Sequence, residues 1–328
     1  MTLLLSRDDV AKVLTMPDCI AAVEGAFAAL ARGEANMPQR AAIKIDNHHG
    51  LFLGMPAYLG GDEECLGLKL VTVYPDNPAK HDLATTLGTL MLCDPTTGAV
   101  NAIMDAGYLT AMRTGAASGV ATKHMARQDA SVCTVFGAGA QARQQLVAVN
   151  HVRPLSQAYV LDVSTEAATA FAADLSEQLG IPVAVGSDAE TAVRAADIIV
   201  TASSSPTPVL DGDWLKPGAH INNIGSHAPT TRELDTKTVA RSYFVADLRE
   251  ANLAEAGDIL IPIQEGAVTE DHIQANLGEV VIGAKPGRTS DDQVTVFKSC
   301  GLAVQDVSTA RAVAAAARAA GIGTEVAM

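Results

Sequence analysis

The chain has 328 residues, of which 48% are hydrophobic, so it is long enough for two domains and apolar enough to bury a core in each. The formal net charge is −14, and aromatic residues make up only 4% of the chain. This composition disfavours binding to nucleic acids and to anionic membranes, and an anionic ligand would need its own local group of cations.

The cysteines and the N-terminal segment indicate the cellular compartment of the protein. The cysteines are odd in number, irregularly spaced and without a CxxC pair: Cys19, Cys65, Cys93, Cys133 and Cys300. Such a set is typical of reduced thiols rather than of disulfides or a metal site. The apolar run "TLLL" is too short for a signal peptide, and no apolar stretch has the length of a membrane span. We therefore expect a cytoplasmic protein without a metal site.

The first part of the chain predicts helices followed by strands. Ser6 and Asp9 fit a capping box, and apolar residues recur at helical spacing from Ile20 to Leu30, so we expect the chain to open with helices. Over 39–105, short runs such as "AAIKI", "LFLGMPAYL" and "LGLKLVTVY" are separated by turn residues. Strands in succession without intervening helices indicate a mostly antiparallel or mixed sheet in the first domain.

After a helix predicted over 105–126, the pattern changes. Apolar runs such as "SVCTVF", "AYVLDVS", "ADIIVTASS" and "HINNIGS" alternate with helix-compatible segments. This alternation is typical of a parallel sheet with helices on both faces. The sequence therefore predicts an α/β fold, in which a Rossmann-type doubly wound parallel sheet follows a mixed α+β domain. A last helix, roughly 302–319 and closed by Gly321, either finishes the second domain or returns to the first.

A glycine-rich motif follows the first strand of the second domain. The segment "GAGAQA" at 137–142 fits G-x-G-x-x-A between an apolar strand and a helix-compatible run. Gly137 permits the tight turn, and Gly139 lets the backbone approach the pyrophosphate, which meets the helix N-terminus at Ala140 and Gln141. The motif predicts a dinucleotide site; the alternative is a flavodoxin-like sheet with an incidental glycine turn.

A carboxylate at the end of the next predicted strand indicates which dinucleotide binds. Asp162 lies 23 residues after Gly139, close to the spacing of a carboxylate that binds the ribose 2′-OH. A carboxylate there would repel a 2′-phosphate, and Val163 stands where an arginine could attract one. NAD(H) is therefore expected in preference to NADP(H).

Two later strands end in polar segments, "VTASSSP" and "NNIGSHAP". Ligands of open α/β sheets lie beyond the carboxyl ends of the strands, so we expect further cofactor-lining residues there. These are Thr201, Ser203, Asn223 and Ile224. His227 follows them, where a nicotinamide ring and its substrate would meet; a solvent-facing turn histidine is the alternative.

Three basic residues, Arg40, Lys69 and Arg113, lie within otherwise apolar stretches of the first domain. A charge embedded in this way is costly unless it is paired, and a ligand that carries a carboxylate is one natural partner. A snorkelling side chain or a structural ion pair is the alternative for each residue taken alone. The three cations are therefore candidates for binding an anionic substrate.

Several segments carry a resemblance to a known family. "MPAYL", "GLKLVTVYP", "TTLGTLMLCDPTTGAVNAIMDAGYLTAMRTGAASGVATK", "VFGAGAQA", "NNIGSHAPTTREL" and "FKSCGLAVQD" together resemble the ornithine cyclodeaminase and mu-crystallin family across essentially the whole chain. The long central segment is far more specific than the glycine motif. The family includes cyclodeaminases, a class of alanine dehydrogenases, ketimine reductases acting on cyclic imines, and iminosuccinate reductase.

The resemblance implies a homodimer with two kinds of domain. A substrate-binding and dimerisation domain over 1–115, completed by a C-terminal helix within 303–328, presents substrate to an NAD-binding domain over 116–302.

The resemblance also assigns residues. It implies that Arg40, Lys69 and Arg113 hold the substrate carboxylate. The positions that it places near the cofactor are Thr85, Arg113, Thr114 and Ser299.

Two departures from the cyclodeaminases narrow the expected reaction. Those enzymes carry a glutamate where this chain has Leu53 and an aspartate where it has His227, and both carboxylates suit the amino groups of a diamine. Their loss leaves a pocket short of anions, which disfavours ornithine and lysine as substrates. An imidazole can instead donate a hydrogen bond to a second carboxylate, or a proton to an imine nitrogen.

We therefore expect NADH-dependent reduction of a small α-imino acid to the L-amino acid. The substrate is either iminosuccinate or a cyclic ketimine such as pyrroline- or piperideine-2-carboxylate. Lys69 and His227 are both candidates for the proton donor, and the choice between them is open. The alternatives are a cyclodeaminase-type ammonia lyase with tightly bound NAD, an alanine dehydrogenase, and a non-catalytic ligand-binding protein of the mu-crystallin kind.

Overall fold

The computed structural model describes residues 1–327, and the chain divides into two units. Met1–Arg113 and the chain from Leu302 onward form the first unit, and Thr114–Gly301 forms the second. The sequence places the boundaries after residues 115 and 302. The observed first boundary falls instead at Arg113, inside the helix α4 (Gly107–Met125), because one continuous helix passes from the first unit into the second.

A mixed eight-stranded sheet forms the first unit. Its strands are β1 (Thr2–Leu5), β2 (Ala35–Asn36), β3 (Ala41–Ile45), β4 (Gly50–Leu59), β5 (Cys65–Val73), β6 (Thr86–Cys93), β7 (Val100–Asp105) and β16 (Thr324–Val326). The order across the sheet is β16-β1-β7-β6-β5-β4-β2, with β3 paired to β4. The pair β1 and β7 is parallel and the other described pairs are antiparallel, so the predicted mixed sheet is confirmed.

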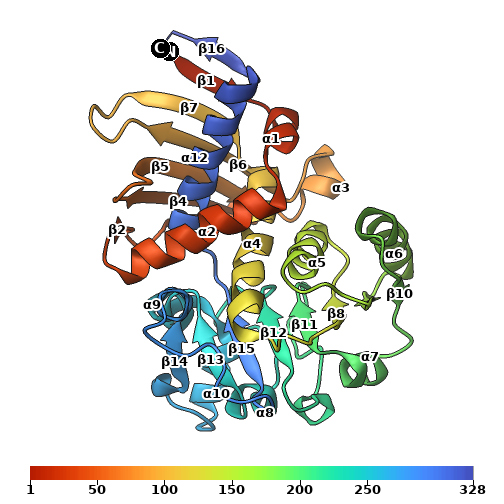
Figure 1. The fold of residues 1–328 in the computed structure, drawn as a ribbon. Coiled ribbons are helices and arrows are strands. Elements are labelled where there is room, and N and C mark those ends of the chain that lie inside the picture. The colour runs from red at the N-terminus through yellow and green to blue at the C-terminus, as the bar shows by residue number, and fades with distance from the viewer. Residues whose placement is uncertain (328) are drawn as a thin grey trace. The chain divides into compact units, whose positions relative to one another are not determined.

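Two long helices cover one face of this sheet, as Figure 1 shows. They are α2 (Met16–Ala31) and α12 (Ala303–Ala320), which pack against each other, and α12 also lies against β4, β5 and β6. The helix α12 returns to the first unit and ends at Gly321, whose positive φ of 65° suits a glycine. The shorter helices of this unit are α1 (Arg7–Val13), η1 (Asp46–His48) and α3 (Asn77–His81). Met328, the last residue of the predicted segment 303–328, lies outside the described residues.

The chain opens with a strand, so the expectation that it opens with helices is wrong. The run "TLLL" forms β1, which lies between β7 and β16. Its partners come from distant parts of the chain, so no local pattern reveals this strand. Figure 1 shows β1 (red) and β16 (blue) side by side. The capping box of Ser6 and Asp9 then starts α1, as predicted.

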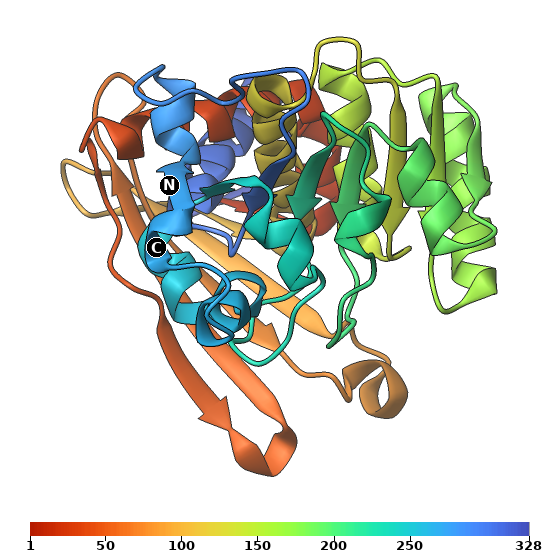
Figure 2. The same ribbon diagram turned by 90° about the horizontal axis from the view of Figure 1, so that it is seen from below.

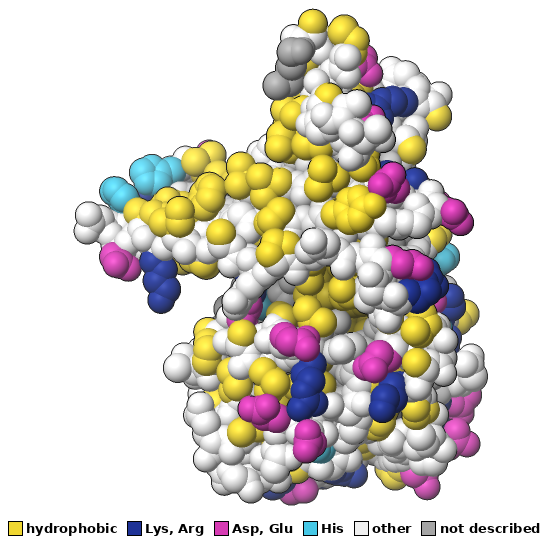
Figure 3. All heavy atoms as spheres, turned by 90° about the vertical axis from the view of Figure 1, so that its left-hand side faces the viewer, with side chains coloured by type: hydrophobic (Ala, Val, Ile, Leu, Met, Phe, Trp, Pro, Cys, Tyr) yellow, Lys and Arg dark blue, Asp and Glu magenta, His cyan; other side chains and the backbone are white. Residues whose placement is uncertain are grey.

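The face of the sheet opposite α12 is apolar and exposed. The strand register places Ile43, Phe52 and Leu87 in one row of this face, and Leu70 in the next. Ile43, Leu70 and Leu87 are 58%, 38% and 41% exposed. Figure 2 shows the strands of this region extending as a long ribbon (orange), and Figure 3 shows hydrophobic side chains (yellow) gathered along it. Lys69, next to Leu70 in β5, has its side chain on the opposite, covered face.

A parallel eight-stranded sheet forms the second unit. Its strands are β8 (Val132–Phe136), β9 (Gln157–Leu161), β10 (Val183–Val185), β11 (Ile198–Thr201), β12 (His220–Asn223), β13 (Tyr243–Ala246), β14 (Ile273–Asn276) and β15 (Thr295–Lys298). The order is β10-β9-β8-β11-β12-β15-β13-β14, and every described pair is parallel. The remaining helices are α5 (Ala140–Val152), α6 (Thr165–Leu179), α7 (Ala189–Ala195), η2 (Gly212–Trp214), α8 (Thr236–Ala240), α9 (Arg249–Glu255), α10 (Gly257–Gln264), η3 (Glu270–His272) and α11 (Leu277–Val281).

Helices cover both faces of this sheet, which gives the second unit two hydrophobic cores. Successive residues of β11 show the division, because Ile198 and Val200 belong to one core and Ile199 to the other. From β8, the sheet adds β9 and β10 on one side and β11 and β12 on the other, so the strand order changes direction between β8 and β11. Ligands of such sheets bind at the carboxyl ends of the strands at this point. The predicted Rossmann-type doubly wound sheet is confirmed.

The five cysteines are free thiols in the structure, and four of them are buried. In the described part of the chain, no single helix is long and apolar enough to cross a membrane. One bent pair, Arg7–Val13 with Met16–Ala31, meets that test by length and composition when the two helices are taken together.

Candidate functional site

The turn between β8 and α5 has the shape of a dinucleotide cradle. Gly137 has a φ of 101°, and a Cβ there would come within 2.5 Å of the Ala202 carbonyl oxygen, so the position requires glycine. Gly139 is the N-cap of α5, and a Cβ there would meet no atom of the described chain within 4 Å. This open space beside a helix N-terminus fits a pyrophosphate group. Ala140 and Gln141 form the first turn of α5 at the same place.

Asp162 is tied to the glycine-rich turn. Its Oδ2 accepts a hydrogen bond from the Ala138 N–H at 2.8 Å, and its Oδ1 accepts one from the Ser164 N–H at 2.8 Å. Each carboxylate oxygen can accept a second hydrogen bond, so a ribose hydroxyl still has an acceptor here. Val163, the next residue, is fully exposed. The carboxylate is thus fixed beside the cradle, as its spacing from Gly139 predicts.

The polar residues at and just after the ends of β11 and β12 lie together. Asn223 Nδ2 donates to Thr201 Oγ1 at 2.8 Å, and the Ile224 N–H donates to the Thr201 carbonyl at 2.8 Å. Ser203 Oγ donates to Glu233 Oε1 at 2.6 Å. Thr201, Asn223 and Ile224 are buried, so their side chains shape the ends of the strands from within.

The other predicted residues of the second unit have different surroundings. His227 is exposed, on the loop between β12 and α8. Thr114 is buried in α4. Ser299 is buried as well, and its hydroxyl donates to Asp247 Oδ2 at 3.1 Å. The predicted cradle residues thus lie together, and so do the residues at the strand ends. Ser299 is instead hydrogen-bonded to Asp247 of the same unit.

The first unit holds a cluster of buried charges. Asp306 of α12 is fully buried; its Oδ2 lies 2.7 Å from Lys69 Nζ, and its Oδ1 accepts from Arg113 Nε at 2.8 Å. Gln305 Oε1 accepts from Arg113 Nη1 at 2.9 Å. One carboxylate therefore links the lysine of β5 to the arginine of α4, and two bonds fix the plane of the guanidinium.

Burial and neighbouring charges set the protonation of Lys69. Desolvation lowers the pKa of its ammonium group to about 8, against the effect of Asp306, which raises it. The positive charges of Arg113 and Arg40 lower the same pKa, so both of the other predicted cations act electrostatically on Lys69. A lysine with this pKa can exchange a proton near neutral pH.

The cluster contains one acid that the sequence analysis did not single out. The loss of two cyclodeaminase carboxylates predicts a site short of anions, and Asp306 is the acid that lies between Lys69 and Arg113. Buried cations require a partner, and α12 supplies it. Leu53 alternates with Met55, which pairs with Lys69, so Leu53 lies on the same face of the sheet as Lys69 and adds no second acid there.

Two predicted residues lie at the beginnings of strands. Arg40 is half-buried and directly precedes β3. Thr85 directly precedes β6, and its carbonyl accepts from the Tyr74 N–H at 2.8 Å.

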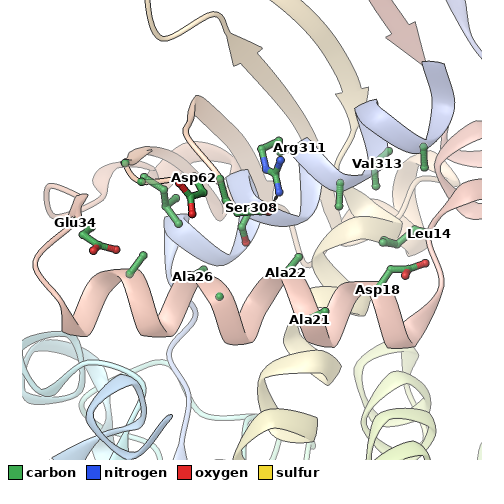
Figure 4. Close-up of a pocket in the computed structure, with 18 of the residues that line it drawn as sticks. Leu14, Asp18, Ala21, Ala22, Ala26, Glu34, Asp62, Ser308, Arg311 and Val313 are labelled. Carbon is green, nitrogen blue, oxygen red and sulfur yellow. Dashed lines mark ion pairs between the residues drawn. The ribbon is translucent and has the colours of Figure 1, made fainter. Parts of the chain in front are cut away.

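A groove of about 870 Å³ lies between α2 and α12 in the first unit, and Figure 4 shows its lining. Ala22 and Ala26 of α2 face Ser308 and Arg311 of α12. The charged lining residues are Asp18, Arg32, Glu34, Asp62, Glu63 and Arg311, among which acids predominate. An anionic substrate would be repelled here, and the lining does not include Lys69, Arg113 or Asp306. The groove is therefore separate from the candidate site.

Sequence reasoning missed Asp306 and Glu233. Both are charged residues with no exposed surface. Asp306 stands in the small and apolar run "GLAVQDVSTARAV", which is the same signal of an embedded charge that singled out Arg40, Lys69 and Arg113. Glu233 follows the polar segment "SHAPTTR", where an acid reads as a solvated side chain.

Known relatives match nearly the whole chain. The model of the ornithine cyclodeaminase/mu-crystallin family matches residues 1–321. Alanine dehydrogenase of Archaeoglobus fulgidus is 37% identical over 99% of this chain and 98% of its own length. Delta(1)-pyrroline-2-carboxylate reductase of Bacillus cereus is 39% identical, with 94% of each chain covered. Ketimine reductase mu-crystallin of Rattus norvegicus is 35% identical, with 94% of this chain and 95% of its own covered.

Solved structures agree with this placement. Thermococcus litoralis Delta(1)-pyrroline-2-carboxylate reductase, in complex with NADH and L-proline, has a TM-score of 0.96 and 44% identity, with 99% of this chain and 100% of its own covered. An archaeal alanine dehydrogenase dimer with bound NAD has a TM-score of 0.93 and 36% identity. The iminosuccinate reductase of Paracoccus denitrificans in complex with NAD+ has a TM-score of 0.92 and 31% identity. Each of these two matches covers 100% of this chain and 99% of the other chain.

The Rossmann-type sheet, its dinucleotide cradle and these relatives together define an oxidoreductase that uses a nicotinamide dinucleotide. The first unit adds buried ammonium and guanidinium groups, which are side chains able to bind a carboxylate. The chain belongs to the ornithine cyclodeaminase/mu-crystallin family.

The two glycines of the cradle are expected to respond differently to alanine. Gly139→Ala adds a methyl group to open space at an ordinary φ of −81°, so thermal stability is kept while the dissociation constant of NADH rises by about tenfold or more. Gly137→Ala forces a Cβ onto the Ala202 carbonyl and lowers the melting temperature. Thermal melts and NADH fluorescence titrations measure both effects. Unchanged NADH affinity in a folded Gly139→Ala variant would contradict the placement of the phosphates.

Proposed function

We propose that the protein is an NADH-dependent reductase of small α-imino acids, which it converts to the corresponding L-amino acids. The carrying observation is the buried cluster in which Lys69 and Arg113 share the carboxylate of Asp306. Such a cluster offers a positive site for a substrate carboxylate and a proton donor of suitable pKa in one place. The relatives that act on pyrroline-2-carboxylate, ketimines and iminosuccinate support this reading.

The cations of the first unit hold the substrate. Arg113 is oriented by Asp306 and Gln305, so its guanidinium can meet a carboxylate without first being ordered. Arg40 adds a second positive charge, whose effect reaches Lys69. A carboxylate fixed in this way places the neighbouring C=N bond in one orientation, which lowers the entropic cost of the reacting step.

Lys69 is the proton donor that we favour. Its ammonium group is buried, and Asp306 keeps it charged against the cost of burial. A protonated imine accepts a hydride more readily than a neutral one, so a donor with a pKa of about 8 serves the reduction at neutral pH. His227 is exposed and remains the candidate for a second role, a hydrogen bond to the side-chain carboxylate of a dicarboxylic substrate such as iminosuccinate.

The second unit is expected to hold the dinucleotide, which supplies the hydride when bound. Gly137, Gly139, Ala140 and Gln141 would hold its pyrophosphate, and the carboxylate of Asp162 would accept from the ribose. Asp162 beside an exposed Val163 supports a preference for NADH over NADPH, because no cation at these two positions offsets the repulsion of a 2′-phosphate. The free thiols support work in a reducing, cytoplasmic setting.

A panel of substrates tests the function. We expect NADH oxidation with pyrroline-2-carboxylate and piperideine-2-carboxylate, or with oxaloacetate plus ammonia, and a lower kcat/KM when NADPH replaces NADH. Pyruvate with ammonia tests the alanine dehydrogenase alternative. Ammonia release from ornithine without net change in NADH would indicate a cyclodeaminase instead. Ligand binding without any turnover would contradict an enzymatic function altogether.

The pH dependence tests the proton donor. Reduction needs the protonated form of Lys69, so kcat/KM is expected to be level at low pH and to fall as the pH rises through about 8. Asp306→Asn removes a charge that raises the pKa of Lys69, so the fall should move to lower pH. Asp8→Asn, a change to an exposed carboxylate of the same unit, serves as the control and should leave the profile unchanged. A folded, active Asp306→Asn variant with an unmoved profile would count against Lys69.

We also propose that the protein is a homodimer that covers the exposed sheet face of the first unit. Ile43, Leu70 and Leu87 form an exposed apolar area on this face, and water-exposed areas of this kind mark protein interfaces. The archaeal alanine dehydrogenase of the same fold is described as a dimer, which supports the proposal.

Leu70→Glu is therefore expected to yield a monomer, because a charge on this face would be buried without a partner in the dimer. Light scattering measures the mass of the wild type, of Leu70→Glu, and of the control Ile282→Glu. Ile282 lies in the second unit and is 39% exposed, against 38% for Leu70. A monomeric wild type, or a Leu70→Glu variant of dimer mass, would refute the proposal.

A further inference from the structure

A single buried carboxylate joins the loops that follow β11 and β12. Glu233 has no exposed surface. Its Oε1 accepts from the Ser203 N–H at 2.7 Å and from Ser203 Oγ at 2.6 Å. Its Oε2 accepts from the Gly225 N–H at 2.7 Å and from Asn223 Nδ2 at 3.3 Å. Four donors meet on one carboxylate, which can accept all of them only in its ionised form.

The buried ion pair of Asp258 and Lys298 holds the backbone around Glu233. Asp258 Oδ1 accepts from the Glu233 N–H at 2.8 Å and from the Leu234 N–H at 2.9 Å. Lys298 Nζ lies 3.0 Å from Asp258 Oδ2 and donates to the Ser226 carbonyl at 2.7 Å. The segment 225–234 is thus anchored at both ends, by Glu233 and Lys298 at its start and by Asp258 at its finish.

The loop between these anchors is closely packed. A Cβ at Gly225 would overlap the Ser203 carbonyl oxygen and the Glu233 carboxylate, so no larger residue fits there. Ser226 Oγ donates across the loop to the Thr231 carbonyl at 2.6 Å. His227 is exposed on this loop, as are Pro229 and Thr230.

We infer that Glu233 is a positioning residue for the proposed reduction: it touches neither substrate nor cofactor, but holds the β11 and β12 ends and the His227 loop in one arrangement. The inference rests on the proposed function. Removing one acceptor would leave a half-buried N–H of Ser203 or Gly225 without this partner and allow the two loops to separate. A small displacement of groups that contact the reacting atoms lowers the rate much more than it weakens the binding of the dinucleotide, whose phosphates meet the distinct turn at 137–142.

The test compares Glu233→Gln with Glu265→Gln. Glutamine at 233 keeps the size of the side chain but presents an amide N–H to one pair of donors. Glu265 lies nearby on the surface, where it pairs with Arg232. The same change at Glu265 serves as the control. With the imine of the panel that the wild type reduces, for example pyrroline-2-carboxylate, we expect kcat of Glu233→Gln to fall on the order of 10- to 100-fold. The dissociation constant of NADH should change by less than about threefold, which is less than 1 kcal/mol. Glu233→Asp, which keeps the charge, should recover part of the rate.

Two further measurements guard against a variant that fails to fold. Ser226→Ala removes the bond across the loop without disturbing a buried charge, and it should lower kcat in the same direction by a smaller factor. Amide hydrogen exchange of the peptides that contain Ser203 and Gly225 should quicken in Glu233→Gln while that of 132–142 stays slow.

The outcomes separate the two ideas. A wild-type chain that reduces no imine overturns the proposed function, and the positioning role falls with it. An active wild type whose kcat is unchanged in both Glu233→Gln and Ser226→Ala overturns the positioning role alone. A parallel loss of NADH binding and of kcat would also overturn it, because Glu233 would then serve the cofactor site or the fold as a whole.

Discussion

The burial of positive charge is the constraint on which both units depend. An ammonium group removed from water costs on the order of several kcal/mol unless a carboxylate pairs with it. Lys69 and Lys298 have almost no exposed surface, and each is paired with an aspartate from another element, Asp306 and Asp258. Each pair fixes more than itself, because Asp306 also orients Arg113 and Asp258 also holds the backbone at Glu233.

The two buried pairs serve different purposes. In the first unit, the cations that act on Lys69 outnumber the acid, so the cluster keeps an excess of positive charge, and the lysine keeps a pKa of about 8. In the second unit, Glu233 and Asp258 outnumber Lys298, and their oxygens are taken up by backbone and side-chain donors. The former cluster is suited to exchange of a proton, and the latter to rigidity.

Patterns local in the sequence were enough to predict the second unit. The glycine-rich turn, the spacing of Asp162 and the alternation of strands with helices each lie within a few dozen residues, and the family resemblance extended them to the whole chain. What the sequence did not reveal depends on distant pairing. The strand β1 forms because β7 and β16 lie beside it. Asp306 lies beside Lys69 because α12 returns to β5, and Glu233 joins two strand ends because both lie within reach of its carboxylate.

The discontinuity of the first unit has a consequence for its formation. During synthesis, the ribosome releases Lys69 and Arg113 long before it releases Asp306, because the whole second unit is made in between. Until α12 arrives, the two cations have no Asp306 to share, and the sheet lacks the part of its cover that α12 gives to β4, β5 and β6. The first unit, although it begins the chain, is therefore the last to become complete, after the second unit has had time to fold by itself.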